Sequence, residues 1–256
     1  MKNNKVEIRY RGSVHRVESG IRVDDFLSSI NGAIPDTVLS ALVNRRQVML
    51  DFPLRGEIDL ELVSFGDREG ESVYKRSVCL MFYEACHKLF PDVRLVIGQS
   101  LGNCYHYQLR GDHPGLDVMA SAIEEMMVEL HGEKRPFKRD TVTIEEAEKA
   151  CRERGCEDKL QLLATRRSST VHILSCGEFI DLAYGPCAPH TGCCPTFGVM
   201  PFEDGLLLRF PRRADRSHLP RFTPRQLLYK TYVETRRWQE LLGVQNVGHL
   251  NQLCID

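Results

Sequence analysis

The chain opens with an alternation of apolar and polar residues, in which Val6, Ile8 and Tyr10 are separated by charged side chains. Alternation with a period of two predicts a half-buried β-strand, and Gly12 supplies the turn into a return strand. A helix is predicted over residues 23–30, because its apolar positions share one helical face. The pattern then indicates further strands at residues 38–43, 47–50 and 58–65.

Two hairpin strands, one helix and then more strands is an order typical of a ubiquitin-like β-grasp fold. The segment Gly66–Gly70 that follows reads Gly-Asp-Arg-Glu-Gly, which is polar and turn-forming. We therefore predict a β-grasp domain over residues 1–66.

Longer amphipathic segments follow this boundary and mix with strand patterns, which predicts an α+β class. Helices are predicted at residues 72–90, 116–130, 143–155 and 223–243, strands at 93–97, 104–109, 170–176, 178–182 and 206–210, and a turn at 98–102. Thr143 and Glu146 have capping-box spacing, and Pro224 suits the first turn of the last helix. We predict an α+β domain over residues 67–213 and a basic helical linker over 214–256.

The composition is that of an ordinary globular protein, with 42% hydrophobic and 27% charged residues. No stretch approaches the ~20 apolar residues that a membrane-spanning helix needs, and the polar N-terminus has no signal-peptide core. The ten cysteines do not follow the spacing of a small disulfide-rich domain. Reduced thiols, a cytoplasmic location and no membrane partner are therefore expected.

The net charge of −1 conceals a basic segment, because nine Lys or Arg residues and only two acidic residues lie between Arg209 and Trp238. Such a stripe predicts phosphate contacts, and the alternative is a solvated linker and helix face. The RNA-binding candidates in it are Arg209, Arg212, Arg213 and Arg216. Trp238 is expected to pack, either on the preceding domain or on a domain supplied elsewhere, rather than to stack on a base.

Nucleotide-binding motifs are absent from the sequence. No Gly-x4-Gly-Lys-Ser/Thr loop occurs, and neither a dinucleotide fingerprint nor a His-Glu-x-x-His helix is found. The segment Gly98–Gly102 has glycines but no lysine to reach phosphates. We therefore expect these 256 residues to perform no ATP chemistry.

Both predicted domains are similar to parts of one family. The first resembles a TGS domain through Gly12-Ser13, Val17-x-x-Gly20-Ile21-x-Val23 and Ala41-Leu42-Val43-Asn44 leading to Pro53-Leu54. The second resembles the second, editing-type domain of threonyl-tRNA synthetase through Ile97-Gly98, Asn103 to Tyr105, Glu146-Ala147 to Arg154-Gly155, and Asp181-Leu182 through Gly185-Pro186 to Pro189. The matching stretches follow the same order over about residues 5–210.

A finer resemblance is to the bacterial nucleoside kinase (uridine kinase-like) family. It rests on Val73-Tyr74-Lys75-Arg76-Ser77-Val78-Cys79, Leu95-Val96-Ile97-Gly98-x-Ser100-Leu101-Gly102-Asn103, Pro189-x-Thr191-Gly192 and Leu208-Arg209-Phe210-Pro211-Arg212. In that family a synthetase-like half precedes a P-loop kinase domain. The resemblance therefore implies a kinase domain, in cis or in trans, beyond the residues given.

The synthetase resemblance also implies the place of a ligand pocket. The editing domain has two His four apart on a helix and a later Cys and His four apart, a set suited to zinc. The match places these positions on Arg76, Leu80, Ala183 and Cys187, of which only the cysteine has an ordinary zinc donor. No metal is therefore expected there.

The expected ligand-binding residues are Arg76, Leu80, Asn103, Tyr105, Asp181, Ala183 and Cys187. Arg76 either binds an anion or pairs with Asp181.

Other cysteines and histidines leave two alternatives open. Cys187-x-x-His190-x-x-Cys193-Cys194 places four ligand types within eight residues, and Cys79 with His106 would supply a second zinc-binding pair if the fold brought them close. A nucleophilic Cys187 or Cys104 beside a histidine is also conceivable. The spacing requires neither, so no catalytic residue and no cofactor are assigned.

The sequence thus predicts a non-catalytic regulatory or binding module of a nucleoside (uridine) kinase-like protein. Its expected partner is RNA, tRNA included, or a small anionic ligand, and not DNA. The alternatives are a free-standing aminoacyl-tRNA editing hydrolase and a nucleoside kinase whose P-loop domain lies outside the chain.

Overall fold

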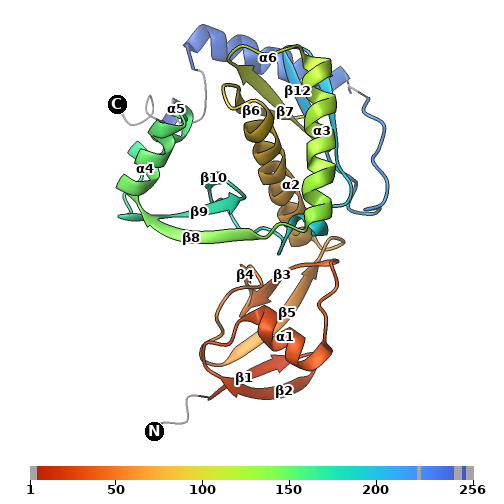
Figure 1. Cartoon of the computed structure of the whole chain (residues 1–256), viewed down its shortest axis with the longest axis vertical. Coiled ribbons are helices and arrows are strands. Elements are labelled where there is room, and N and C mark those ends of the chain that lie inside the picture. Colours follow the sequence, from red (N-terminus) through yellow and green to blue (C-terminus); the bar gives the residue numbers. More distant parts are fainter. Residues whose placement is uncertain (1–4, 224–225, 245–249, 252–256) are drawn as a thin grey trace.

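The structure is a computed structural model that describes residues 5–223, 226–244 and 250–251. Its elements form a smaller first unit and a larger second unit, which meet where β5 (Ile58–Ser64) leads into α2 (Arg68–Leu89) (Figure 1). Three sheets combined with helices confirm the mixed α+β class. Among the described residues, no helix has both the length and the apolar character needed to cross a membrane.

The first unit is a five-stranded sheet covered by one helix. Its remaining elements are β1 (Lys5–Tyr10), β2 (Ser13–Glu18), α1 (Val23–Asn31), β3 (Val38–Val43) and β4 (Arg46–Val48). The strand order is β2-β1-β5-β3-β4, with β1 and β5 parallel and the other pairs antiparallel. Fully buried side chains such as Ile8, Phe26 and Leu54 fill the space between helix and sheet. Arg11 and Gly12 both have positive φ, so the predicted turn joins β1 to β2.

The second unit places α2 between two antiparallel sheets (Figure 1). One sheet has the order β11-β12-β7-β6 and the other β10-β9-β8. The strands are β6 (Arg94–Ser100), β7 (Cys104–Arg110), β8 (Phe137–Thr143), β9 (Thr170–Cys176), β10 (Phe179–Leu182), β11 (Gly198–Phe202) and β12 (Gly205–Arg209). The further helices are α3 (Leu116–Glu133), α4 (Ile144–Glu153), α5 (Glu157–Ala164), the 3-10 turn η1 (Thr191–Cys193) and α6 (Gln226–Leu242). The large core of this unit includes the fully buried rings of Tyr74, Phe82 and Tyr107.

The start of α2 differs from the predicted start at Ser72. The helix begins at Arg68, so Ser72 lies inside it and does not cap it. Asp67 instead accepts a hydrogen bond from the Ser64 amide (2.7 Å), which closes the turn between β5 and α2. Gly70 lies in the first helical turn, where a Cβ would overlap the Ser64 carbonyl oxygen. The polar, glycine-containing segment is therefore a tight strand-to-helix junction and not only a linker.

Some elements were not predicted or have different bounds. Strand β6 continues to Ser100 through part of the predicted turn, with an irregularity between Ile97 and Ser100. Gly98 allows β6 and β7 to lie close together at this point, because a Cβ on residue 98 would lie 3.1 Å from the His106 carbonyl oxygen. The sequence pattern also did not predict β8, α5 or β11. The cap prediction involving Pro224 lies outside the described residues.

A buried ion pair fixes the wall of the second unit that faces α2. The Glu84 carboxylate accepts hydrogen bonds from Arg135 Nη1 (2.7 Å) and from the Phe179 amide (2.8 Å). Glu84 is almost fully buried, so these two donors compensate its desolvation. The pair holds the start of β10 against α2 and so determines where the Phe179 ring lies.

Candidate functional site

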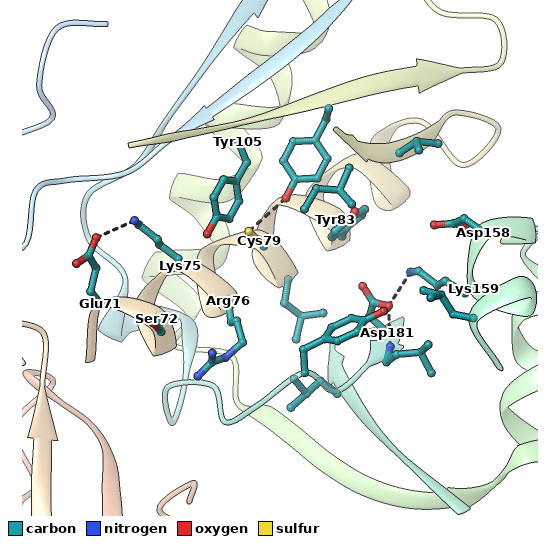
Figure 2. A pocket seen from close by; sticks show the side chains of 18 of the residues that line it. Glu71, Ser72, Lys75, Arg76, Cys79, Tyr83, Tyr105, Asp158, Lys159 and Asp181 are labelled. Carbon is teal, nitrogen blue, oxygen red and sulfur yellow. Dashed lines mark hydrogen bonds and ion pairs between the residues drawn. The ribbon is translucent and has the colours of Figure 1, made fainter. Parts of the chain in front are cut away.

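A cleft of about 710 Å³ opens between α2, the hairpin β6–β7 and the pair α5–β10 (Figure 2). Arg76 and Leu80 line it from successive turns of α2, Tyr105 from β7 and Asp181 from β10. Four of the seven expected ligand-binding residues therefore lie together, although they are spread along the sequence from Arg76 to Asp181. A volume of this size suits a drug-sized or nucleotide-sized ligand.

Arg76 is held in the cleft wall by a single hydrogen bond. Its Nε donates to the Pro186 carbonyl oxygen (2.9 Å), while the buried Nη2 has no acceptor among the described residues. Gly185 leaves room for the guanidinium, since a Cβ at this position would lie 2.9 Å from Arg76 Cζ. Burial lowers the pKa of Arg76, and the groups that oppose this shift are the side chains of Cys187, Tyr105 and Cys79. The guanidinium is therefore a donor with an unfilled position, suited to an anion or a carbonyl oxygen.

The alternative in which Arg76 pairs with Asp181 is wrong. Lys159, on α5, lies 2.7 Å from Asp181 Oδ1, and both side chains are largely buried. Burial by itself would lower the pKa of Lys159, but Asp181 next to it raises the pKa above its ordinary value. Lys159 therefore neutralises Asp181 and leaves Arg76 without an acidic partner in the described part of the chain.

Aromatic rings form much of the cleft wall. Tyr83 stacks on Phe179 with ring centroids 5.1 Å apart, and Lys159 Nζ lies 5.3 Å from the Tyr83 ring centroid. Tyr105 contacts Phe210 edge to face, and Tyr107 donates its hydroxyl hydrogen to Cys79 Sγ (3.2 Å). Flat rings beside a guanidinium can bind a base or a ring together with a charged group.

The described wall of this cleft contains no histidine, and its thiol is not activated. Burial raises the pKa of Cys79 to about 12, despite the hydrogen bond from Tyr107. Burial also raises the pKa of Cys187 to about 12, and this side chain is only 1% exposed. Cys187 therefore lacks both the access and the thiolate character that a nucleophile needs.

Three expected ligand-binding residues do not line the cleft. The Asn103 carbonyl oxygen accepts a hydrogen bond from the Phe210 amide (2.9 Å), which places Asn103 at the join of β7 and β12. Ala183 and Cys187 pack with the main core behind the wall. The cleft is also lined by four residues that were not predicted from the sequence, namely Lys75, Tyr83, Lys159 and Tyr184. The repeat of Lys75, Cys79 and Tyr83 at a spacing of four was the available signal for the shared face of α2.

The basic stripe divides into engaged and exposed arginines. Arg209 donates to the Pro220 carbonyl oxygen (2.7 Å), and Arg216 donates to the backbone carbonyl oxygens of Asp36 and Cys193. Arg212 and Arg213 are exposed. Of the four RNA-binding candidates, these last two are therefore the ones with free side-chain surface.

Trp238 does not pack on the preceding domain, which corrects the first of the two packing expectations. Its side chain is 62% exposed, and Leu241 and Leu242 near it on α6 are also exposed. Tyr232 is instead the ring of α6 that is buried, 5.3 Å from the His106 ring. The amphipathic pattern of this helix did not indicate which of its aromatic residues faces the sheet.

The cysteine-rich segment does not gather the four side chains of the zinc-knuckle alternative in the described part of the chain. His190 and Cys193 lie together, but the third ligand-type side chain beside them is Asp36 from the first unit. Cys79 accepts a hydrogen bond from the Tyr107 hydroxyl, and His106 packs against Tyr232. Cys79 and His106 therefore do not supply a second pair of zinc ligands. Cys104 is buried, and burial raises its pKa to about 11, which does not suit a nucleophile.

The chain is related to threonine–tRNA ligases over about three quarters of its length. It is 33% identical over 192 residues to the threonine–tRNA ligase of Desulforamulus reducens, covering 74% of this chain. It is 29% identical over 190 residues to the ligase of Acetivibrio thermocellus, and 30% identical over 181 residues to that of Clostridioides difficile. No protein-family model matches the chain.

The chain spans only about 30% of the length of these relatives. The relationship supports the predicted resemblance to threonyl-tRNA synthetase. It extends to a part of those proteins and not to their whole length.

Proposed function

We propose that the chain is a tRNA-binding module that holds the 3′ end of the RNA in the cleft between α2, β6–β7 and α5–β10. The observation that carries this proposal is the buried Nη2 of Arg76, which has no acceptor in the described part of the chain and lies in an aromatic-walled cleft. A guanidinium binds a phosphate or carboxylate oxygen, and tyrosine rings stack on an unpaired base. The relationship to threonine–tRNA ligases favours tRNA over other RNAs.

The second candidate is an editing-type hydrolase that removes amino acids from tRNA. The relationship to threonine–tRNA ligases supports it. The cleft chemistry disfavours it, because Lys75 is paired with Glu71 (2.7 Å), Lys159 with Asp181, and the thiols are buried. Hydrolysis would then depend on main-chain groups and on hydroxyl groups of the substrate.

The organisation of the chain is part of the proposal. We assign residues 1–66 to a TGS-like β-grasp domain, 67–213 to an editing-like domain and 214–256 to a linker. The parallel pairing of β1 with β5, with β3 and β4 beyond it, supports a β-grasp. The first unit has an apolar core of its own, built from residues between Val6 and Leu60, which supports a division near residue 66.

The association with a nucleoside kinase stays a prediction of the sequence, and the relatives reported above support only its tRNA-related part. Reading the coding sequence beyond Asp256 for a Gly-rich Lys-Ser/Thr loop tests it directly. Such a loop would assign ATP chemistry to residues outside those described.

Binding of uncharged tRNA to the Arg76→Ala chain tests the main proposal. We expect its affinity to fall about tenfold, which corresponds to about 1.4 kcal/mol and to the loss of one charge-assisted hydrogen bond. Arg167→Ala is the matched control, because Arg167 is an exposed arginine that does not line the cleft. Arg76→Lys keeps the positive charge but lacks the planar guanidinium that can donate two parallel hydrogen bonds. We therefore expect its affinity for tRNA to be intermediate.

The 3′ end is tested with tRNA that lacks its terminal single-stranded nucleotides. We expect wild-type protein to bind this RNA as weakly as the Arg76→Ala chain binds intact tRNA. Equal affinity of the wild type for both RNAs, or of both proteins for intact tRNA, would show that the cleft does not hold the 3′ end.

Deacylation of aminoacyl-tRNA separates the two candidates. If the chain is a binding module, the aminoacyl ester should hydrolyse at the same rate as in buffer alone, or more slowly because the bound protein shields it. Turnover above that rate, abolished by Arg76→Ala, would establish the hydrolase in its place.

A further inference from the structure

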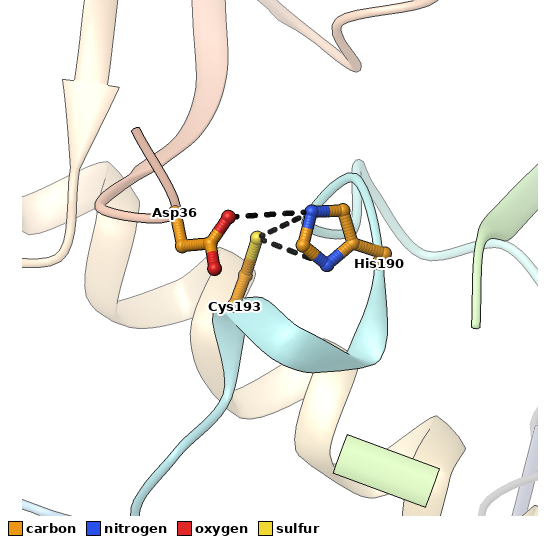
Figure 3. Close-up of side chains that lie close together, drawn as sticks. All are labelled: Asp36, His190 and Cys193. Carbon is orange, nitrogen blue, oxygen red and sulfur yellow. Dashed lines mark hydrogen bonds and ion pairs between the residues drawn. The ribbon is translucent and has the colours of Figure 1, made fainter. Parts of the chain in front are cut away.

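Three ligand-type side chains converge where the first unit meets the second. Asp36 lies in the loop between α1 and β3, His190 directly precedes the turn η1, and Cys193 is the last residue of that turn (Figure 3). Cys193 Sγ is 3.8 Å from each ring nitrogen of His190, and His190 Nε2 is 3.5 Å from Asp36 Oδ1. One atom from each residue lies within 4.8 Å of the other two.

The 3.5 Å between His190 Nε2 and Asp36 Oδ1 is longer than an ordinary hydrogen bond between nitrogen and oxygen, at about 2.7–3.2 Å, and the 3.8 Å contacts of Cys193 Sγ are long, weak hydrogen bonds. These separations resemble the edges of a coordination tetrahedron. With metal–sulfur and metal–nitrogen bonds of about 2.3 and 2.0–2.1 Å, tetrahedral zinc keeps its ligand atoms roughly 3.3–3.6 Å apart. The observed 3.5 and 3.8 Å are within a few tenths of an ångström of that range.

The turn that carries His190 and Cys193 is firmly held. Thr191 is fully buried, accepts a hydrogen bond from the Arg135 amide (2.9 Å) and donates its hydroxyl hydrogen to the Leu130 carbonyl oxygen. Gly192 permits the close packing, because a Cβ would lie 2.7 Å from Lys134 Cγ and 2.9 Å from His190 Nδ1. Local structure therefore positions both donors before any ion binds.

The carboxylate is oriented from outside the cluster. Asp36 Oδ2 accepts a hydrogen bond from Lys134 Nζ (2.9 Å), which leaves Oδ1 directed at His190. Such an outer partner fixes a ligand in metal sites. Lys134 and Arg216 are also positive charges near the cluster, but a carboxylate and a thiolate together balance the charge of one divalent ion.

A hydrolytic Cys-His-Asp triad would use the same three residue types. Cys193 is only 1% exposed, so a substrate carbonyl carbon has no approach to its sulfur. Asp36 and His190 are partly exposed, and an ion small enough to pass beside them needs no such approach.

We propose that Asp36, His190 and Cys193 form a zinc-type site that links the two units of the chain. Its ligands are one thiolate, one imidazole and one carboxylate, and solvent completes a tetrahedron. Both units contribute ligands, so ion binding stabilises their contact.

Titration of the reduced, metal-free full chain with Co²⁺ tests the site. We expect one ion per chain and a thiolate-to-cobalt charge-transfer band, with Zn²⁺ displacing Co²⁺. Cys193→Ser should abolish the band, and Cys156→Ser, at a partly exposed thiol outside the cluster, should preserve it. No band in the wild type, or a band that survives Cys193→Ser, would overturn the proposal.

Asp36→Asn provides a variant that does not disturb the core, because Asp36 is a partly exposed loop residue. We expect Co²⁺ to bind it at least tenfold more weakly, with the thiolate band still forming at high Co²⁺. Zn²⁺ should raise the melting temperature of the wild type and raise that of Asp36→Asn less. Unchanged Co²⁺ affinity in Asp36→Asn would exclude a site that spans both units.

Discussion

At the scale of single residues, His106 shows how burial sets a charge state. It is fully buried on β7, with the Tyr232 hydroxyl 3.5 Å from Nδ1 and Asp204 Oδ1 3.9 Å from Nε2. Burial lowers its pKa and nearby Arg236 acts in the same direction, although Asp204 opposes them. The fold therefore favours the neutral imidazole, against which α6 packs.

The lowered pKa of His106 predicts that the free energy of unfolding decreases as the pH falls. Because the pKa of His106 is lower folded than unfolded, the unfolded chain binds more protons as the pH falls through the ordinary histidine range, about 6.5. The contribution to stability is present above that value and is lost on acidification. We expect urea unfolding of His106→Gln to vary less between pH 7.5 and 5 than that of the wild type.

His113→Gln is the control for this measurement, because His113 is exposed in the loop after β7. Its unfolding free energy should keep the pH dependence of the wild type. A His106→Gln profile as steep as that of the wild type would show that burial of this imidazole does not contribute to the acid sensitivity.

At the scale of elements, the capping box of α4 is a local feature that the sequence predicted correctly. Thr143 Oγ1 accepts a hydrogen bond from the Glu146 amide (3.2 Å), and Glu146 Oε2 accepts one from the Thr143 amide (2.8 Å). Thr143→Ala should lower the free energy of unfolding by about 1 kcal/mol, because the Glu146 amide loses its acceptor. Urea denaturation followed by circular dichroism measures this.

Glu146→Gln is the matched variant for the cap. Its amide oxygen can still accept from the Thr143 amide, so we expect a loss of only a few tenths of a kcal/mol. Equal losses in both variants would mean that charge at the helix start, and not the reciprocal hydrogen bonds, stabilises this end of α4.

The sequence could predict the elements that carry a local signal, and it could not predict those that form through pairing with a distant segment. β1 alternates clearly because one face is buried and the other is wet, and α4 carries its own cap. β8 has the sequence Phe-Lys-Arg-Asp-Thr-Val-Thr and little apolar pattern, since most of its side chains are exposed. It forms through antiparallel pairing with β9 over its whole length. A strand held by a partner thirty residues away leaves only a weak local signal.

In the candidate site, too, local spacing could be predicted from the sequence and contacts between distant segments could not. The shared face of Arg76 and Leu80 could be predicted from helical spacing. The Lys159 and Asp181 pair could not, because it requires α5 to lie against β10. Asp36 beside His190 depends on the contact between the two units, which no local pattern encodes.

At the scale of the whole molecule, Arg216 joins the two units and is not free for a ligand. Its Nη2 donates to the carbonyl oxygens of Cys193 in the second unit and Asp36 in the first. The guanidinium also lies 5.9 Å from the Phe65 ring and 5.6 Å from the Tyr74 ring, on either side of the junction between β5 and α2. The same residue type thus serves structure at 216 and exposes its charge at 212 and 213.

RNA binding and stability should therefore separate along this basic stripe. Arg216→Ala should lower the free energy of unfolding by roughly 2 kcal/mol, because two partly buried carbonyl oxygens lose their donor and two rings lose a cation. At temperatures where it is folded, its RNA affinity should match that of the wild type. The double variant Arg212→Ala/Arg213→Ala should keep wild-type stability and bind RNA more weakly. Its slope of log affinity against log salt should fall by about 0.7–0.9 for each phosphate contact removed. An unchanged slope would show that the exposed arginines are a solvated face, and an altered slope in Arg216→Ala would contradict its assignment as a structural link.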